Sequence, residues 1–410
     1  NDLREATRLT LQLGIPTAVL INGSDGTDRP IADFADAVGL PIAGRIPFSR
    51  EYAEAFARGH ILVHRFPELN DRLLAVFDGL KPSTPPPPAE APLGRSTETA
   101  VAPIPTEGNG GSREIVVISG KGGTGKTTVC ASLAALGIGA AFADCDVEVP
   151  DLPLLLRGDV RGSHPFRGGA KARIDAKRCT GCGKCIDACR SRAIVGDKDS
   201  GSGEKEAFRV DPLSCDGCGS CMHACPTDAV RLEPRVTGRT FLSETTRGPL
   251  AHARSGIAEE NTGKLVREVR RLAGAAEARA PSSGILSDAP PGTGGPVIAS
   301  VSGADLVLLV TEPTIPGLHG LRRVLALMAR SRVPAAIVVN KADLHPAATQ
   351  QIGRIARRHR IPVLGHIPFD PEVRRALMDG RTPVANGDGP ARRALRKIAG
   401  ELNALLEAEH

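Results

Sequence analysis

The chain has 410 residues, more than one ordinary domain needs, and this length predicts two or three domains. Hydrophobic residues make up 41% and charged residues 24%, a balance that excludes a mostly disordered or collagen-like protein despite 46 Gly and 33 Pro. The net charge is only +6, and aromatic residues are 3%, with no Trp and one Tyr. We expect no nucleic-acid partner, since single-stranded binding uses aromatic stacking inside a basic groove.

The sequence also lacks the signals of a membrane protein. It contains no apolar run long enough to span a bilayer, and residues 1–10 carry mixed charge rather than an apolar signal region. We therefore expect a cytoplasmic protein without a membrane partner.

Residues 1–80 resemble the end of the chain. The segment 14–22 aligns with 332–340, Asp25 aligns with Asp343, and 40–48 aligns with 361–369. Self-similarity of this kind predicts two copies of one structural unit. We expect residues 1–80 to be the C-terminal half of a first copy, and residues 113–410 to be a complete second copy.

The two copies are separated by residues 81–112. This segment is rich in Pro, Thr and Gly, and it includes four consecutive prolines at 85–88. Such a composition buries too little apolar surface to offset the entropy lost on ordering. It predicts an extended linker.

Residues 113–410 alternate short apolar runs with longer helical patterns. We expect strands at 114–119, 139–143, 284–287, 305–310, 335–339 and 363–366, and helices at 126–136, 262–272, 318–330, 347–358, 371–379 and 390–407. Nearly continuous apolar strands separated by helices predict an α/β fold with a parallel sheet covered by helices on both faces. Residues 171–235 break this rhythm and hold eight of the ten cysteines, so we expect a small inserted domain there.

A glycine-rich loop follows the first expected strand of this second copy. It fits the pattern G-x-x-x-x-G-K-[ST] and consists of Gly120, Lys121, Gly122, Gly123, Thr124, Gly125, Lys126 and Thr127. We also expect Thr128, the next residue, to contact the nucleotide. In such a P-loop, backbone N–H groups converge on phosphate oxygens, Lys126 reaches the β and γ phosphates, and the Thr127 hydroxyl contacts Mg²⁺. The sequence predicts a site for a nucleoside triphosphate with Mg²⁺.

The position of Lys121, directly after the first glycine, resembles the deviant P-loop of the MinD, ParA and nitrogenase iron-protein class of ATPases. The resemblance covers nearly all of residues 113–410. It implies a P-loop NTPase fold that binds and hydrolyses ATP, with Lys121 reaching across a dimer interface to the nucleotide of the other unit. The implied partner is a second copy in a homodimer, or another such unit in a tandem pseudo-dimer within one longer chain.

Two acidic segments resemble the switches of this class. The segment from Asp288 to Gly294 resembles the second switch, which implies that Asp288 holds a magnesium-bound water and Gly292 senses the γ phosphate. Asp144 and Asp146 resemble the first switch, whose carboxylates orient Mg²⁺ and the attacking water, and we favour Asp146 for the water. A solvated turn at a strand end is the alternative interpretation.

The segment Asn340-Lys341-Ala342-Asp343 resembles the base-contacting segment of the class. The resemblance implies that Asn340 reads adenine, and the preference for ATP over GTP rests on it. The matching segment of the first copy, residues 22–25, lacks the lysine and has no P-loop attached, so we assign it no nucleotide site.

Eight cysteines form two runs with the spacing C-x2-C-x2-C-x3-C, at Cys179, Cys182, Cys185 and Cys189 and again at Cys215, Cys218, Cys221 and Cys225. Paired runs of this spacing resemble the bacterial two-cluster ferredoxin, in which the fourth cysteine of each run ligates the other cluster. The resemblance implies one [4Fe-4S] cluster on Cys179, Cys182, Cys185 and Cys225, and a second on Cys215, Cys218, Cys221 and Cys189. Zinc would leave the third and fourth cysteines of each run without a role, and a reducing compartment disfavours disulfides.

Together these motifs predict an ATPase whose nucleotide-dependent dimer switch controls electron transfer through two clusters to a redox partner protein. One alternative is an iron-sulfur cluster carrier or assembly ATPase that hands clusters to a client. A MinD-like positioning ATPase is the other, although the final residues, 405–410, do not form the basic amphipathic anchor expected of it.

Overall fold

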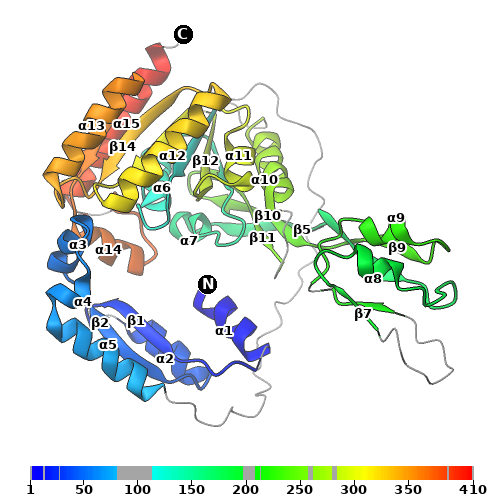
Figure 1. Cartoon of the computed structure of the whole chain (residues 1–410). Coiled ribbons are helices and arrows are strands. Elements are labelled where there is room, and N and C mark those ends of the chain that lie inside the picture. The colour runs from blue at the N-terminus through cyan, green and yellow to red at the C-terminus, as the bar shows by residue number, and fades with distance from the viewer. Residues whose placement is uncertain are drawn as a thin grey trace.

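The computed structural model describes residues 2–12, 14–26, 28–80, 113–196, 208–212, 214–256, 262–278, 284–385 and 387–408. The expected linker, 81–112, lies outside these residues. Within them, a nine-stranded sheet forms the centre of the molecule (Figure 1). Its strands in spatial order are β15 (Val363–Ile367), β14 (Ala335–Asn340), β13 (Leu306–Thr311), β3 (Glu114–Ser119), β12 (Ile285–Pro291), β4 (Ala141–Asp144), β11 (Gly248–Ser255), β10 (Gly238–Thr245) and β5 (Asp159–Phe166).

The direction of the strands changes along this sheet. Neighbouring strands from β15 to β11 pair in parallel, and all six strands expected from the sequence belong to this part. By contrast, β10 is antiparallel to both β11 and β5. The expectation of a wholly parallel sheet was therefore wrong at this end. Only Thr246 and Arg247 connect β10 to β11, and a connection this short forces an antiparallel hairpin.

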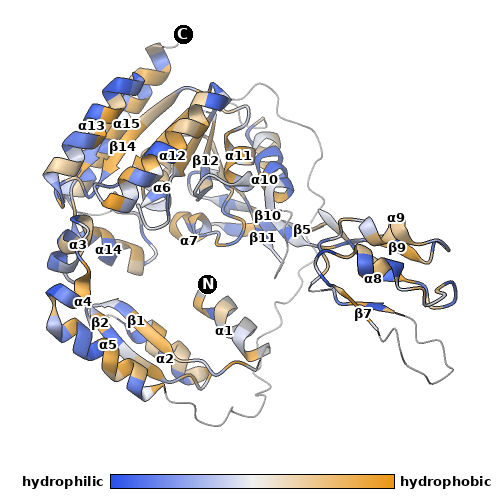
Figure 2. Cartoon of the chain, in the orientation of Figure 1, coloured by the Kyte–Doolittle hydropathy of each residue, from blue (hydrophilic) through white to orange (hydrophobic). Residues whose placement is uncertain are grey.

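Helices cover both faces of the parallel part, as the apolar strands predict. In β3, Ile115 and Val117 join the core beneath α6 (Lys126–Ala135) and α15 (Pro390–Ala408), whereas Val116 and Ile118 join the opposite core. Side chains alternate along a strand, so a strand that is apolar throughout needs cover on both sides. The second face carries α11 (Gly295–Val301), α12 (Ile315–Ser331) and α13 (Pro346–His359), and Figure 2 shows apolar strands between amphipathic helices.

A third core lies toward the antiparallel end, where α10 (Thr262–Glu277) packs on β4 and β11 through Leu265, Val266 and Val269. Shorter helices, α7 (Leu152–Leu156) and α14 (Pro371–Met378), complete this part of the fold. Among the helices that the structure describes, none combines the length and apolar character needed to cross a bilayer.

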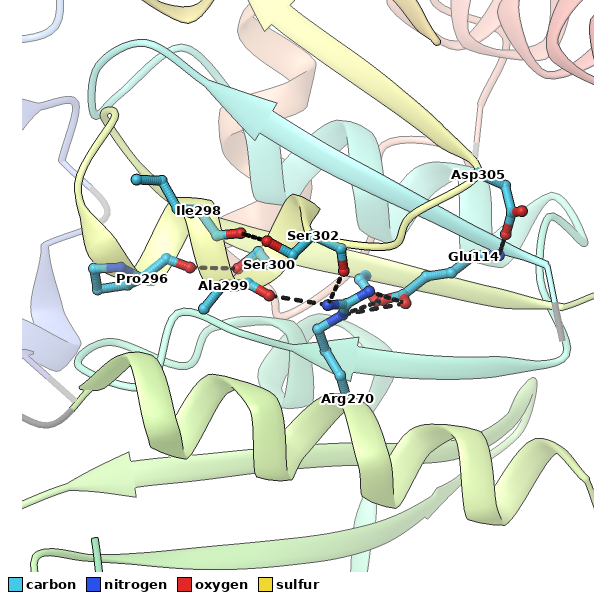
Figure 3. Close-up of polar contacts among 9 residues, drawn as sticks. Glu114, Arg270, Pro296, Ile298, Ala299, Ser300, Ser302 and Asp305 are labelled. Atoms are coloured by element: carbon cyan, nitrogen blue, oxygen red, sulfur yellow. Dashed lines mark hydrogen bonds and ion pairs between the residues drawn. The ribbon is translucent and has the colours of Figure 1, made fainter. Parts of the chain in front are cut away.

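A buried ion pair joins α10 to the sheet (Figure 3). The Arg270 guanidinium contacts both carboxylate oxygens of Glu114, with the shortest distance 2.5 Å, and donates through Nη1 to the carbonyl oxygens of Ala299 (2.9 Å) and Ser302 (2.7 Å). The Ser287 hydroxyl also donates to Glu114 (2.5 Å). Arg270 of α10 thus connects β3 to the end of α11, and Glu114 connects β3 to β12.

The cysteine-rich segment projects from the antiparallel end of the sheet (Figure 1). It leaves from β5, returns into β10, and consists of β6 (Gly169–Ile174), α8 (Lys184–Ala188), β7 (Ile194–Val195), β8 (Arg209–Val210), α9 (Ser220–Ala224) and β9 (Val230–Arg235). Antiparallel pairs β6–β9 and β7–β8 frame the two short helices. Ala193, Phe208 and Val230 form a small core with the cysteines, separate from the cores of the large sheet.

The N-terminal region contains α1 (Asp2–Gln12), β1 (Val19–Ser24), α2 (Arg29–Ala37), β2 (Ile42–Pro47), α3 (Arg50–Ala57), α4 (Leu62–Arg65) and α5 (Pro67–Gly79). β1 and β2 pair in parallel, with Leu20 opposite Gly44. In β14 and β15 the aligned residues, Val338 and Gly365, are likewise opposite each other. The matching register supports the repeat, and the assignment of residues 1–80 as half of a first copy stays a prediction.

Candidate functional site

The P-loop lies between the end of β3 and the start of α6, at the carboxyl edge of the parallel strands. Gly123 and Gly125 adopt φ angles of +78° and +88°, a left-handed backbone that favours glycine. Gly120 lies so close to the backbone of Gly320 in α12 that a side chain there would collide with it. At Gly122 and Gly123, by contrast, a Cβ would meet nothing within 4 Å. The loop leaves room over its own backbone for a phosphate chain.

Three predicted residues meet at the base of this loop. The Lys126 ammonium lies 2.7 Å from Asp288 Oδ2, and the Thr127 hydroxyl donates to the same oxygen (2.6 Å). Burial opposes a charged lysine, but the carboxylates of Asp288, Asp144 and Asp146 together outweigh it and raise the pKa of Lys126. The cation is therefore held in its charged form where the phosphates are expected.

Two buried oxygen atoms at this site have no hydrogen-bond partner within the described residues: Thr124 Oγ1 and Asp288 Oδ1. Leaving buried polar atoms unpaired is costly, so their presence beside an open glycine loop points to a ligand. Hydroxyl and carboxylate oxygens are the ligands that Mg²⁺ prefers. Residues Thr124, Thr127 and Asp288 thus fit a magnesium-bound triphosphate.

The carboxylates of the first switch lie beside Asp288. Asp144 ends β4 directly opposite Asp288 on β12, and it accepts from the backbone N–H groups of Leu152 (2.9 Å) and Asp146 (3.1 Å). Burial, followed by repulsion from Asp288, raises the pKa of Asp144 well above its usual range. Burial likewise raises the pKa of Asp146 to about 6. Accumulated negative charge of this kind is suited to a site that binds a cation.

A buried acid that the sequence reasoning missed holds the lysine characteristic of the deviant P-loop. Glu312, 3% exposed, contacts Lys121 (2.5 Å) and Lys341 (2.9 Å). Burial opposes its ionisation, but the two lysines outweigh burial and lower its pKa. The available signal was a single glutamate directly after the apolar strand β13.

The second switch lies beside the P-loop. Gly292, with φ +100°, donates its N–H to Ser119 O (2.8 Å), the last residue before the loop.

Of the expected base-contacting segment, Asn340 and Lys341 border a cavity of about 370 Å³ next to the P-loop, which Gly125 and Thr128 also line. Asn340 Nδ2 donates to Thr124 O (2.7 Å), and its Oδ1 accepts from Lys341 N–H (3.0 Å). Asp343 accepts from Phe369 N–H (2.6 Å) and pairs with Arg50 (2.8 Å). Asn340 therefore joins the base loop to the P-loop, while Asp343 braces the loop from outside the cavity.

The two cysteine runs have closely matching geometry. The second cysteine of each run is exposed, the third is buried, and the fourth is half-buried. The Sγ atoms of the fourth cysteines, Cys189 and Cys225, accept from the backbone N–H groups of Ala193 (3.3 Å) and Ala229 (3.2 Å). Left-handed glycines precede the third cysteine of each run by two and by four residues, at Gly181, Gly183, Gly217 and Gly219.

A small cavity brings Cys189 of the first run together with Cys215, Cys218 and Cys221 of the second. This is the crossed set implied for one of the clusters. Within the described residues, no three ligating side chains converge closely enough to hold a single metal ion. In a cubane each thiolate binds a different iron, whereas a zinc site gathers its ligands around one ion.

The sequence profile described as the CobQ/CobB/MinD/ParA nucleotide binding domain matches residues 115–384. The chain belongs to this family. The match spans the whole parallel sheet and the cysteine-rich segment, and it confirms the α/β P-loop fold and the MinD/ParA-type ATPase domain expected from the motif around Lys121.

Several proteins are similar to this family member. An uncharacterised protein of Methanocaldococcus jannaschii is 30% identical over 268 residues, which cover 64% of this chain and 87% of that protein. An iron-sulfur cluster carrier protein of Pyrococcus abyssi is 30% identical over 138 residues, covering 30% of this chain and 46% of that protein. The structure of the cell division ATPase MinD of Pyrococcus furiosus superposes with a TM-score of 0.41 at 19% identity, covering 72% of this chain and 99% of that chain.

Proposed function

We propose that this MinD/ParA-type protein is a Mg²⁺-dependent ATPase in which ATP at the P-loop controls electron transfer through two [4Fe-4S] clusters on the cysteine-rich segment. The nucleotide part rests on the geometry around Lys126, Thr127 and Asp288. The redox part rests on the spacing of the eight cysteines and on the cavity that brings Cys189 to Cys215, Cys218 and Cys221.

At the nucleotide site, the residues divide the chemistry among them. The backbone of the glycine loop and Lys126 bind the phosphate chain, and Lys126 must exchange its contact with Asp288 for a phosphate oxygen. Asp146, whose pKa of about 6 lies close to neutral pH, is suited to orient the attacking water and take up its proton. Bound Mg²⁺, held by Thr127 and Asp288, would supply charge neutralisation at the phosphates.

The second lysine of the loop requires another unit. Lys121 is held by Glu312 within its own chain, and it must leave that contact to reach a nucleotide bound elsewhere. We propose that ATP binding drives closure with a second MinD-like unit, in a homodimer or a tandem pseudo-dimer, and that Lys121 then acts across the interface. A ligand shifts such an equilibrium only if it binds the closed state more tightly, and this cross-contact supplies the difference.

At the clusters, the thiolates of the two runs would hold the iron, while the N–H groups of Ala193 and Ala229 stabilise negative charge on Cys189 and Cys225. Hydrogen bonds to cluster sulfurs raise the reduction potential, because they favour the more negative reduced state. Cys182 and Cys218 are exposed, which gives a redox partner protein access to either cluster.

One observation carries the proposed coupling: the nucleotide site and the cysteine-rich segment share a continuous sheet. β4 ends in the switch residue Asp144 and pairs with β11, where His252 is opposite Asp144. β11 pairs with β10, and β10 pairs with β5, so the two strands that lead into and out of the cysteine-rich segment belong to this ladder. Ser255 N–H also donates to Val147 O (2.8 Å), just beyond the first switch. Movement of the switch on nucleotide binding can therefore reach the clusters through backbone pairing.

The test is anaerobic redox titration of the reconstituted protein with and without Mg-ATP. We expect ATP to shift the reduction midpoints or the rate of reduction by an external donor, and Lys126→Ala to abolish that response while keeping its iron. Identical cluster behaviour with and without nucleotide in the wild type would refute the coupling.

A second function, cluster delivery, is favoured by the similarity to the iron-sulfur cluster carrier protein of Pyrococcus abyssi. It predicts that the clusters pass to an apo-protein acceptor and that the donor loses iron in proportion. Electron transfer predicts reversible reduction with full retention of iron. Incubation with an apo-ferredoxin, followed by separation and iron analysis of both proteins, distinguishes the two.

A further inference from the structure

The cavity next to the P-loop has a wall that comes from the N-terminal region. Phe48, which follows β2, lines this cavity together with Gly123, Thr128 and Asn340. Its ring stacks on Phe369, with centroids 5.8 Å apart and planes 13° from parallel. An apolar cavity of about 370 Å³ with a few polar groups has the size and character of a small-ligand site.

Local structure fixes Phe48 in this position. Its N–H donates to Ser24 O (2.8 Å) at the end of β1, and the next residue, Ser49, caps α3 by accepting from Tyr52 N–H (3.3 Å). Phe48 therefore sits between the end of a strand and a helix cap, with little freedom to move independently.

Reciprocal contacts hold the N-terminal region against the base loop. Arg50 pairs with Asp343 (2.8 Å), and Arg374 pairs with Asp25, the residue that aligns with Asp343 in the repeat. Each arginine also lies over the phenylalanine of the other region, Arg374 at 5.0 Å from the Phe48 centroid and Arg50 at 5.7 Å from the Phe369 centroid. Phe48 is equivalent to Phe369 in the repeat and Asp25 to Asp343, so the contact brings matching positions of two like units together.

The same region also covers the lysine after the first P-loop glycine. Phe56 in α3 lies over Lys121, with the ammonium 5.9 Å from the ring centroid. Residues 48–56 therefore span the site from the base cavity to Lys121.

We propose that Phe48 is a base-stacking residue and that residues 1–80 form one wall of the nucleotide site. This inference rests on the proposed function and deepens it. The occupant is the aromatic base of a nucleotide whose phosphates lie in the P-loop, because the cavity is continuous with Gly123 and Gly125. Asn340 keeps capacity on both amide atoms for one further hydrogen bond to that base. Nucleotide binding and docking of residues 1–80 consequently strengthen each other, by the reciprocity of linked equilibria.

The test compares a ligand that has a base with one that lacks it. We would measure the dissociation constants of Mg-ATP and of Mg-tripolyphosphate for the full chain, for Phe48→Ala and for the control Phe77→Ala, whose side chain in α5 is 71% exposed. Loss of one stacked base contact weakens ATP binding by roughly 5- to 150-fold. Binding of tripolyphosphate should stay within about 2-fold, because it occupies only the loop. Phe77→Ala should match the wild type for both ligands.

Unchanged ATP binding by Phe48→Ala, or an equal loss of both ligands, would overturn the inference. Equal binding of ATP and tripolyphosphate by the wild type would also overturn it while leaving the phosphate site intact. If the wild type bound neither ATP nor tripolyphosphate, the proposed function itself would be refuted.

A second measurement avoids any substitution. Photolysis of the wild type with 8-azido-ATP should label the tryptic peptide 46–50, which contains Phe48, and excess ATP should suppress the label. Labelling confined to peptides from 113–410 would overturn the assignment.

Discussion

Removal of Arg270 tests the buried ion pair shown in Figure 3. In Arg270→Met, the Glu114 carboxylate keeps the Ser287 hydroxyl but loses its cation, and the carbonyl groups of Ala299 and Ser302 lose their donor. Glu114 is 3% exposed, so water cannot replace the guanidinium without opening the core. Breaking one side of a buried ion pair costs about 3–5 kcal/mol.

The assay is thermal unfolding followed by circular dichroism. A loss of this size lowers the midpoint by roughly 6 to 20 °C, at about 2–4 °C per kcal/mol for domains of 150–250 residues. The matched control is Arg271→Met, because Arg271 pairs with Glu268 on the same helix at 2.7 Å but both side chains are 30% exposed. Removal of a partly exposed pair of this kind should cost only about 0.2–1 kcal/mol.

A double variant isolates the ion pair from simple loss of packing. Glu114→Gln combined with Arg270→Met removes both charges and keeps an acceptor for Ser287, so we expect it to be more stable than Arg270→Met alone. A free energy of unfolding of Arg270→Met within about 1 kcal/mol of the wild-type value would refute this prediction, since burying an unpaired carboxylate costs more than that. If the double variant lost as much free energy of unfolding as Glu114→Gln and Arg270→Met lose separately in sum, the two charges would not interact.

Three further predictions concern the two sites. Burial raises the pKa of Asp146 to about 6, so kcat/KM for ATP hydrolysis should rise with pH through about 6, and Asp146→Asn should be slow and lack that step. Because folding raises this pKa, Asp146 adds to the free energy of unfolding below about pH 4, and that contribution is lost as pH rises through about 6. Chemical denaturation should show this loss in the wild type and not in Asp146→Asn. Anaerobic reconstitution should give roughly eight irons per chain. If the ligands cross, the double variant Cys189→Ala, Cys215→Ala loses ligands of one cluster and should retain about half of the iron. The double variant Cys179→Ala, Cys215→Ala loses a ligand of each cluster and should retain almost no iron. Half retention in both double variants would contradict two separate four-cysteine sites.

Local features of the sequence were sufficient for much of the fold. Apolar runs located six of the seven strands in the parallel part of the sheet, because a strand buried on both faces is mostly apolar. Glycine spacing located the P-loop, since the phosphate-binding loop must adopt left-handed angles at Gly123 and Gly125. The strands β5, β10 and β11 were not predicted, because polar and charged residues interrupt all three and weaken the apolar signal. Only β5 lies at the edge of the sheet, and most of its residues are exposed or half-buried.

The sequence by itself determined which residues we expect to bind phosphates and which cysteines we propose as iron ligands, because both chemistries depend on spacing along a short stretch of chain. Only the tertiary structure decided which distant residues share those sites. Asp144 faces Asp288, Glu312 lies between Lys121 and Lys341, and Phe48 closes a cavity beside Asn340. Such contacts join positions far apart in the chain, and they depend on how whole strands and helices pack rather than on any pattern that neighbouring residues carry.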